Sequence, residues 1–219
     1  MSIALSLGNN LTTGGIFKPT AVNNTSVNNV TDFASITGDA TLVLLSTQTA
    51  SASASISFTT GIDSTYDEYI FKFINIHPQT DNVYFNYNFS TDGGSNYNVT
   101  KTTTYFAAEH GQDGSGASLA YNGSADLAQS TNYQYMFVNT ASENDQSVAA
   151  TMHLFNPSST TFVKHFITVS VGDSTPNYVY NIRTAGYCNT TSAINAVDFK
   201  MSSGNIDDGI IKMYGVAKS

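Results

Sequence analysis

The sequence predicts an all-β protein: an antiparallel, jelly-roll-like β-sandwich preceded by an extended N-terminal arm. The chain of 219 residues contains 13 Tyr and 13 Phe, which suit the half-buried surface of a strand and are scarce in disordered chains. Apolar and polar residues alternate between turn signals, as expected of half-buried strands. No useful helical periodicity occurs, so helical crossovers between parallel strands are not expected. The length fits a single body of this class.

The clearest alternation covers Val83–Ser90. It predicts a strand that places one set of side chains on a single face: Val83, Phe85, Tyr87 and Phe89. A slip of one residue would expose three aromatic rings to water, so the register is well specified. Similar reasoning predicts strands over 52–59, 69–76, 133–138, 147–155, 161–171, 178–182, 193–201 and 210–216, nine or ten in all.

Turn signals separate these strands. Gly supplies positive φ in 92–94, 203–204 and 208–209, and Pro presets the turn at 156–159. The strand over 69–76 is expected to stop at His77-Pro78, because Pro cannot donate to the ladder. The Gly-rich stretch 109–123 predicts a long loop, which in a compact β-domain is usually functional or mobile.

Residues 1–40 differ in composition from the body, which spans 41–219. They carry few large apolar side chains and several polar runs, such as 23–29. Alone, such a segment buries too little surface to offset the entropy of ordering it. We predict an extended arm that orders against a partner or along the edge of the body, with a free tail as the alternative.

Composition excludes several classes of function. The formal net charge is −8, and no basic run could follow a phosphate backbone, so nucleic-acid binding is not expected. The single Cys188 rules out an internal disulfide and a zinc site made of cysteines. No apolar segment reaches 18 residues and the N-terminus lacks a basic region, which predicts a protein made in the cytosol without membrane insertion. Solubility then depends on Ser, Thr and Asn, which together make up 76 residues.

The titratable side chains form no recognisable catalytic motif or metal-binding motif. Four histidines lack ligand spacing: His77, His110, His153 and His165. Glu109, His110 and Asp113 share the long loop without a nucleophile elbow, so loop residues are the favoured interpretation. We therefore predict no catalytic residues, no cofactor and no metal.

Two groups of carboxylates leave alternatives open. Asp63, Asp67 and Glu68 precede one strand, and Asp207-Asp208 precede the last. Turn hydrogen bonding is the favoured role. A glycan depolymerase would instead use a pair of acids, such as Asp63, Glu68 or Glu109. A calcium site is a further alternative, although the sequence contains no EF-hand loop.

Four tyrosines are predicted near loops with Asn and Ser beside them: Tyr97, Tyr105, Tyr121 and Tyr187. Such side chains suit the stacking and adaptable hydrogen bonding of glycan or protein recognition. They are the candidate ligand contacts, with packing at sheet edges as the alternative for each one.

Several segments of the chain resemble segments of a known group of proteins and follow one another in the same order. The chain is similar, over about 41–216, to virion appendage proteins of marine tailed bacteriophages. The segments that carry the resemblance are 61–69 (GIDSTYDEY), 75–78 (NIHP), 90–97 (STDGGSNY), 155–161 (FNPSSTT), 186–187 (GY), 192–194 (SAI), 203–206 (SGNI) and 211–215 (IKMYG).

The resemblance implies a β-sandwich at the outer surface of a phage particle, without catalytic residues to carry over. It implies a fibre or other tail appendage, symmetric copies with a trimer favoured, docking on other virion proteins and a host-surface glycan as the expected ligand. A head decoration protein that stabilises the capsid is the alternative. The depolymerase is disfavoured because the sequence shows no repeats of a β-helix.

Overall fold

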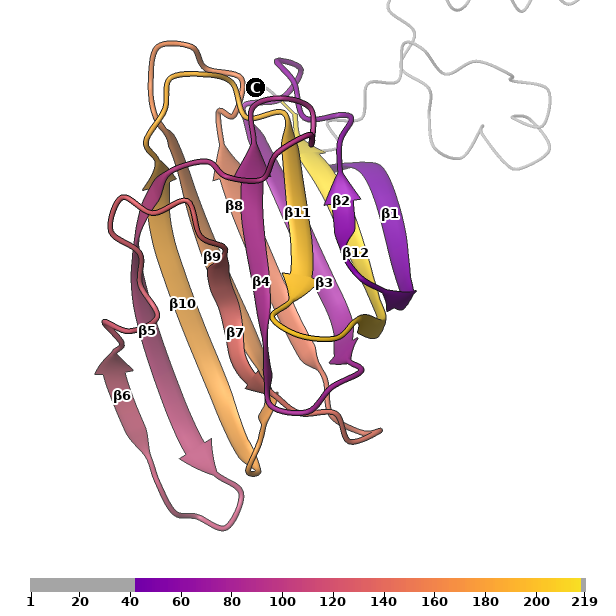
Figure 1. The fold of residues 1–219 in the computed structure, drawn as a ribbon, viewed down its shortest axis with the longest axis vertical. Helices are drawn as coiled ribbons and strands as arrows, with labels where there is room; N and C mark the ends of the chain where they lie inside the picture. The colour runs from indigo at the N-terminus through magenta and orange to yellow at the C-terminus, as the bar shows by residue number, and fades with distance from the viewer. Residues whose placement is uncertain (1–41, 218–219) are drawn as a thin grey trace, which may run out of the picture. The chain divides into compact units, whose positions relative to one another are not determined.

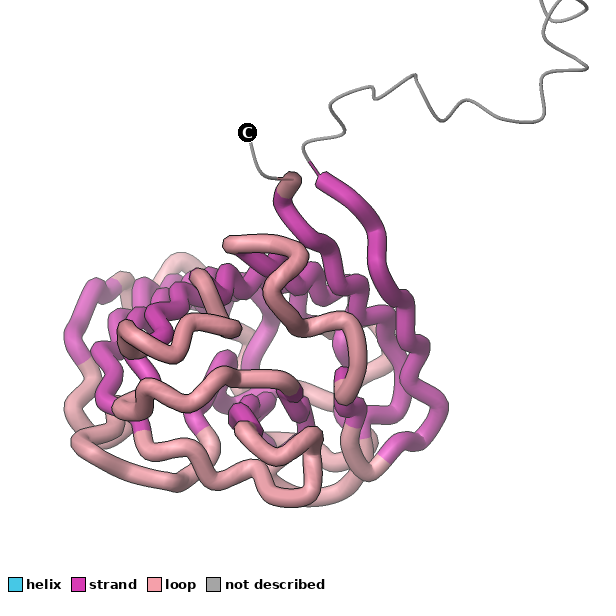
Figure 2. The backbone as a smooth tube through the Cα atoms, turned by 90° about the horizontal axis from the view of Figure 1, so that it is seen from above, coloured by secondary structure: helices cyan, strands magenta, loops and turns pink. Residues whose placement is uncertain are grey.

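The computed structural model describes residues 42–217, which form strands and loops without a helix (Figure 1, Figure 2). The predicted arm at 1–40 lies outside the described residues. The strands of the described part are β1 (Leu42–Ser53), β2 (Ile56–Phe58), β3 (Glu68–Pro78), β4 (Val83–Ser90), β5 (Lys101–Gly111), β6 (Ser118–Tyr121), β7 (Gln134–Thr140), β8 (Val148–Phe155), β9 (Lys164–Ser174), β10 (Tyr178–Cys188), β11 (Ala196–Met201) and β12 (Ile206–Val216). The prediction of an all-β protein is confirmed.

All the strand pairs are antiparallel, and one hydrogen-bonded path runs β1-β12-β3-β8-β9-β7-β4-β11-β2. A branch leaves β9 through β10 to β5 and β6. Between β9 and β7 the path depends on one pair, Thr140 with Ser174, and there the sheet turns from one layer into the other. In Figure 1, β2, β11, β4 and β7 lie in front of the layer that contains β12, β3, β8 and β9.

The path almost closes on itself. Its two ends, β1 and β2, are consecutive in sequence, and Gln48 Nε2 donates to the backbone oxygen of Ser57 at 2.7 Å. Near-closure limits the unpaired edges of this path, which would otherwise invite pairing with other chains. Strand β6 of the branch, which pairs only with β5, keeps an open edge.

Aromatic rings from both layers fill the interior. Phe199 of β11 lies against Phe71 and Phe73 of β3, with ring centroids 5.5 and 4.8 Å apart. Farther along, Phe166 of β9 contacts Tyr87 of β4 at 5.7 Å. The predicted face of Val83–Ser90 is therefore confirmed, because its apolar side chains point into this core.

Several predicted boundaries were wrong. The segment 52–59 is not one strand: β1 ends at Ser53, where Ala52 has a φ of 48°, and β2 starts at Ile56. Strand β3 continues through Pro78, which is compatible with proline because it occupies the last position of the strand. Strand β12 begins at Ile206 and so contains Asp207 and Asp208.

The long loop predicted over 109–123 is partly wrong. Strand β5 runs to Gly111 and is paired along its whole length with β10, and β6 forms a hairpin with β5. The sequence signal is weak there because Thr and Ala dominate β5 and every residue of β6 is exposed. The hydrogen bonds to β10 stabilise β5 as a strand, although its own residues prefer this conformation only weakly.

Candidate functional site

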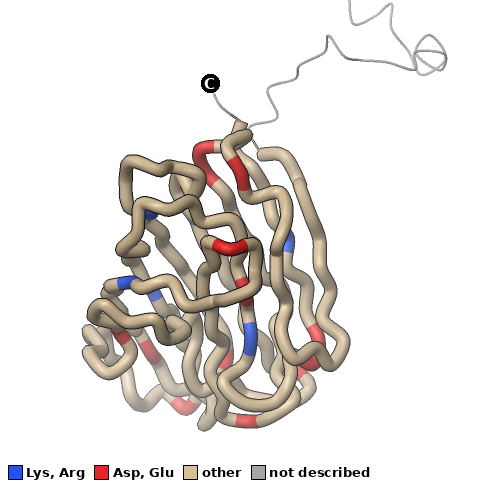
Figure 3. The backbone as a smooth tube through the Cα atoms, turned by 45° about the horizontal axis from the view of Figure 1, so that its top comes forward, with Lys and Arg blue, Asp and Glu red and all other residues tan. Residues whose placement is uncertain are grey.

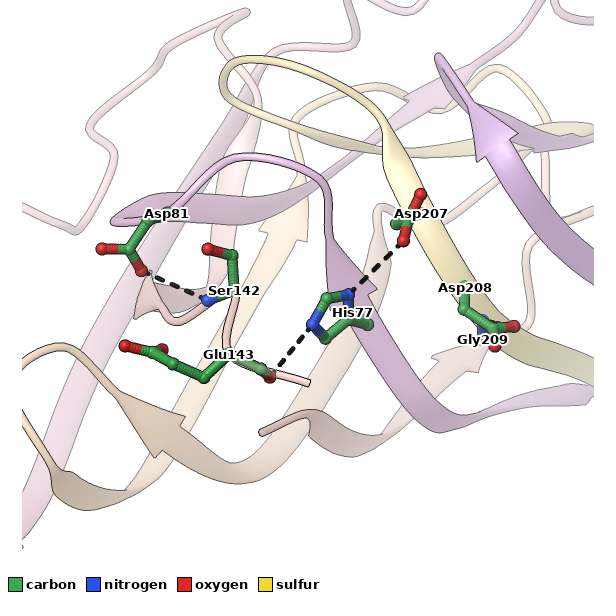
Figure 4. A network of polar contacts seen from close by, with 7 residues as sticks. All are labelled: His77, Asp81, Ser142, Glu143, Asp207, Asp208 and Gly209. Carbon is green, nitrogen blue, oxygen red and sulfur yellow. Dashed lines mark hydrogen bonds and ion pairs between the residues drawn. The ribbon is translucent and has the colours of Figure 1, made fainter. Parts of the chain in front are cut away.

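A polar cleft of about 500 Å³ opens where three segments meet: the end of β3, the start of β12 and the loop between β7 and β8. It is lined by Asn75, His77, Asn144, Asp145, Gln146, Ser147, Asp207 and Asp208. Carboxylate, amide and imidazole groups thus surround one opening. Figure 4 shows His77 between the loop and β12.

Irregular pairing creates this opening. The register of β12 against β3 shifts on both sides of Asp208, and β3 shifts against β8 between Phe73 and Ile76. Asn75 has a φ of 51°, and Gly209 has a φ of 132°. A Cβ at Gly209 would lie 2.9 Å from the backbone oxygen of Asn75, so the close approach needs glycine. Bulges of this kind bend strands and redirect side chains.

His77 is held between the loop and β12. Its Nε2 lies 3.2 Å from the backbone oxygen of Glu143, to which it donates when it carries the proton. Its Nδ1 lies 3.9 Å from Asp207 Oδ2, too far for a hydrogen bond but close enough for an ion pair when the ring is charged. Asp81 fixes the same loop by accepting from Ser142 N at 3.2 Å (Figure 4).

The chemistry of the cleft is that of hydrogen-bonded recognition. Carboxylates accept from hydroxyl groups, and side-chain amides both donate and accept. Gln146 Oε1 is shielded from solvent and has no hydrogen-bond partner among the described residues, so the acceptors that a ligand can reach in the cleft are on other side chains. A ligand rich in hydroxyl groups matches these side chains.

The acids considered as depolymerase candidates are not gathered at this cleft. Asp63 accepts from Thr65 N at 2.8 Å in a turn, and these hydrogen bonds lower its pKa. Glu68 Oε1 lies 2.6 Å from His153 Nδ1. Glu109 accepts from Ser118 Oγ across the β5–β6 hairpin at 2.9 Å. Each of these acids has a partner of its own, and none of the three lines the cleft.

The four candidate tyrosines do not form one site. Tyr97 lies in the loop between β4 and β5, and Tyr121 ends β6 with half of its surface exposed and its hydroxyl on Asp126. Tyr187 lies in β10, where its hydroxyl accepts from Gln129 Nε2 at 3.2 Å. The placement of Tyr105 near a loop was wrong: it lies within β5 and is fully buried, and burial raises its pKa. Its ring belongs to the core and lies on the same buried face of β5 as Thr103.

Sequence reasoning missed the cleft. His77 and Asp207 are 130 positions apart in the printed sequence, and β3 and β12 bring them together. His77 lies in a segment that carries the resemblance, and Asp207 belongs to a pair of carboxylates for which the sequence favoured a role in turn hydrogen bonding. Nothing in the sequence indicated that β3 and β12 are neighbours.

Residues 42–217 contain no group of three or more His, Cys, Asp and Glu side chains that could hold a metal ion. Within the same range, no helix has the length and apolar character needed to span a membrane. Acidic and basic positions are spread thinly along this part of the chain (Figure 3).

Comparisons with models of protein families, with curated proteins and with solved structures find no match to this chain.

Proposed function

We propose that this protein is a non-enzymatic structural component of a tailed-phage virion, a fibre or other appendage whose body binds a hydroxyl-rich host glycan through the cleft around His77. In this proposal residues 1–40 dock on other virion proteins, and identical copies assemble as a trimer. The ordered sequence resemblance and the all-β body support the virion assignment. The lining of the cleft supports the ligand class.

The observation that carries the proposal is the position of the cleft relative to the start of the body. Leu42, where residues 1–41 join the body, pairs with Val216 at the end of β12. Asp207 of the cleft lies at the opposite end of β12. At about 3.3 Å per residue, the two ends are about 30 Å apart. An appendage needs this separation between its attachment point and its ligand-binding end.

We also propose that the fold is a jelly-roll-like sandwich. Its support is a nested set of strand pairs, β3 with β12, β4 with β11, β5 with β10 and β8 with β9. Nested antiparallel pairs arise when a long hairpin winds around a core, as in a jelly roll. The pairing of β3 with β8 differs from the usual arrangement and puts β12, β3, β8, β9, β10 and β5 in one continuous layer.

Immunogold labelling of intact particles with antibody against the body tests the location. Label confined to the tail or tail vertex is expected. A variant lacking residues 1–40 should still fold, as judged by its circular dichroism and cooperative melting, but should be missing from particles. Normal incorporation of that variant would contradict docking through the arm.

The cleft gives a prediction about binding. Replacing Asp207 with Asn is expected to weaken binding to purified host surface polysaccharide roughly tenfold or more, because hydrogen bonds to charged groups contribute about 1.5–3 kcal/mol. Isothermal calorimetry on the full chain measures the change. Asp173→Asn on β9, outside the cleft, is the matched control and should bind like the parent protein. Equal loss in both variants, or loss in neither, would contradict recognition by the cleft.

One observation favours a head decoration protein as a second candidate. Large apolar side chains are exposed on the layer that contains β9, β10 and β5: Phe106, Ile167, Val171 and Val179 are each at least 44% exposed. An apolar face of this kind suits contact with another protein. This candidate predicts immunogold label over the whole head, unchanged adsorption and earlier capsid rupture when the protein is missing.

A further inference from the structure

Lys101, at the start of β5, is fully buried. Its Nζ donates to Asn88 Oδ1 at 2.6 Å and to the backbone oxygen of Val99 at 3.1 Å. Both acceptors are neutral, although a buried ammonium group is stable mainly when it is paired with a carboxylate. Burial accordingly lowers the pKa of Lys101 to about 8. The lowered pKa increases the share of this amine that is unprotonated and nucleophilic at neutral pH.

The carboxamide of Asn88 is fixed on both sides. Its Nδ2 donates to the backbone oxygens of Tyr97 and Thr131 at 2.6 and 3.0 Å. Its Oδ1 accepts from Lys101 Nζ and also from the backbone N–H of Phe89 at 2.9 Å. The N–H of Phe89 therefore points at the oxygen that would become negative if the carbonyl carbon were attacked. Because Asn88 is itself fully buried, water competes little for the carbonyl.

We propose that Lys101 and Asn88 join in an intramolecular isopeptide bond. The unprotonated Nζ of Lys101 attacks Cγ of Asn88, forming the Nζ–Cγ bond. The Cγ–Nδ2 bond then breaks, and Nδ2 leaves as ammonia with a proton that Nζ gives up. The products are one secondary amide and one ammonia molecule, so no oxidant or other reactant is needed. Holding amine and carboxamide in contact supplies the proximity that makes such a step unimolecular.

The hydrogen-bond contacts of Nζ and Nδ2 go to neutral oxygens, so the proton passes from one nitrogen to the other within the pair. Asp198 is an acidic neighbour of Asn88 in the sheet. It lies directly opposite Asn88 in the β4–β11 register, and side chains so paired have Cβ atoms about 4.5–5.5 Å apart. It is buried, and its carboxylate accepts from Ser57 Oγ at 2.5 Å and Tyr133 Oη at 2.9 Å. These two hydroxyl groups hold the carboxylate, and we assign it no step in the reaction.

The bond would link parts of the body that the sheet leaves unpaired. Strands β4 and β5 are not hydrogen-bonded neighbours: β4 pairs with β7 and β11, whereas β5 pairs with β10 and β6. The bond would also close the segment 89–100, which contains Tyr97, into a covalent ring. Such a cross-link lowers the conformational entropy of the unfolded chain and so stabilises the body against unfolding.

Intact-mass spectrometry of the purified full chain tests the proposal. We expect the mass to be lower than that of the sequence by one ammonia, after allowance for removal of Met1. Tandem spectrometry of a protease digest should then show a branched peptide joining Lys101 to Asn88. An Asn-Gly cyclic imide at Asn122-Gly123 would give the same mass loss, but mild alkali opens the imide and leaves the isopeptide intact.

Variants distinguish a covalent bond between Lys101 and Asn88 from the hydrogen bond between them. Lys101→Met should restore the full mass. Lys164→Met should keep the loss of ammonia, because Lys164 is also fully buried but its Nζ donates to the backbone of Thr190. A parent chain of full mass without the branched peptide would overturn the proposal, whether or not the variants fold.

Discussion

Replacing Phe199 with Ala is expected to lower the free energy of unfolding by about 3–5 kcal/mol, the range for truncating a buried Phe. The ring is fully buried in β11 and lies within 6.3 Å, centroid to centroid, of four rings from three other strands: Phe58, Phe71, Phe73 and Phe85. Those strands belong to both layers, so the cavity cannot collapse by moving one element. The loss should therefore lie near the upper part of this range.

Urea unfolding followed by tyrosine fluorescence measures this effect. With an m-value of about 2 kcal/mol/M, the midpoint should fall by about 2 M. Phe162→Ala is the matched control, because that ring is 68% exposed and its removal should change stability by less than about 0.5 kcal/mol. A midpoint for Phe199→Ala close to that of the control would show that the two layers do not pack through this ring.

Gly186→Ala is expected to lower the free energy of unfolding by about 1–3 kcal/mol through overpacking. An added Cβ would lie 2.5 Å from the backbone oxygen of Thr102, 2.7 Å from Thr103 Cγ2 and 2.9 Å from Phe166 Cζ. Strand β10 is hydrogen-bonded to β5 on one side and to β9 on the other, so it cannot move away from either. Close packing thus explains the glycine of segment 186–187, which is one of the segments that carry the resemblance.

Thermal unfolding of Gly186→Ala beside Ala185→Val tests this explanation. Ala185 precedes the glycine in the same strand but is exposed on the opposite face, where a β-branched residue is tolerated. The control should melt within a few degrees of the parent protein, and Gly186→Ala well below it. Equal melting temperatures would mean that the backbone relaxes around the added methyl group.

Local pattern was sufficient to predict the class of the protein and part of its core. In β4, strict alternation correctly assigned the inward face, because the side-chain period of a strand is two residues and one face is strongly apolar. In β5 and β6 the same reasoning failed, because Thr, Ala and exposed residues carry little periodic signal. Tyr105 was misplaced with them, and it lies on the buried face of a strand that pairs with one more than 70 residues later.

The sequence by itself determined that the chain forms antiparallel strands, where several of them lie and that its surface relies on uncharged polar groups. Only the tertiary structure decided which side chains meet. His77 faces Asp207 because β3 pairs with β12, and Asn88 faces Asp198 because β4 pairs with β11. The physical reason is that propensity and periodicity act over a few neighbouring residues, whereas strand pairing joins residues separated by more than a hundred positions. The cleft depends on such a pairing, because β3 and β12 bring His77 and Asp207 together.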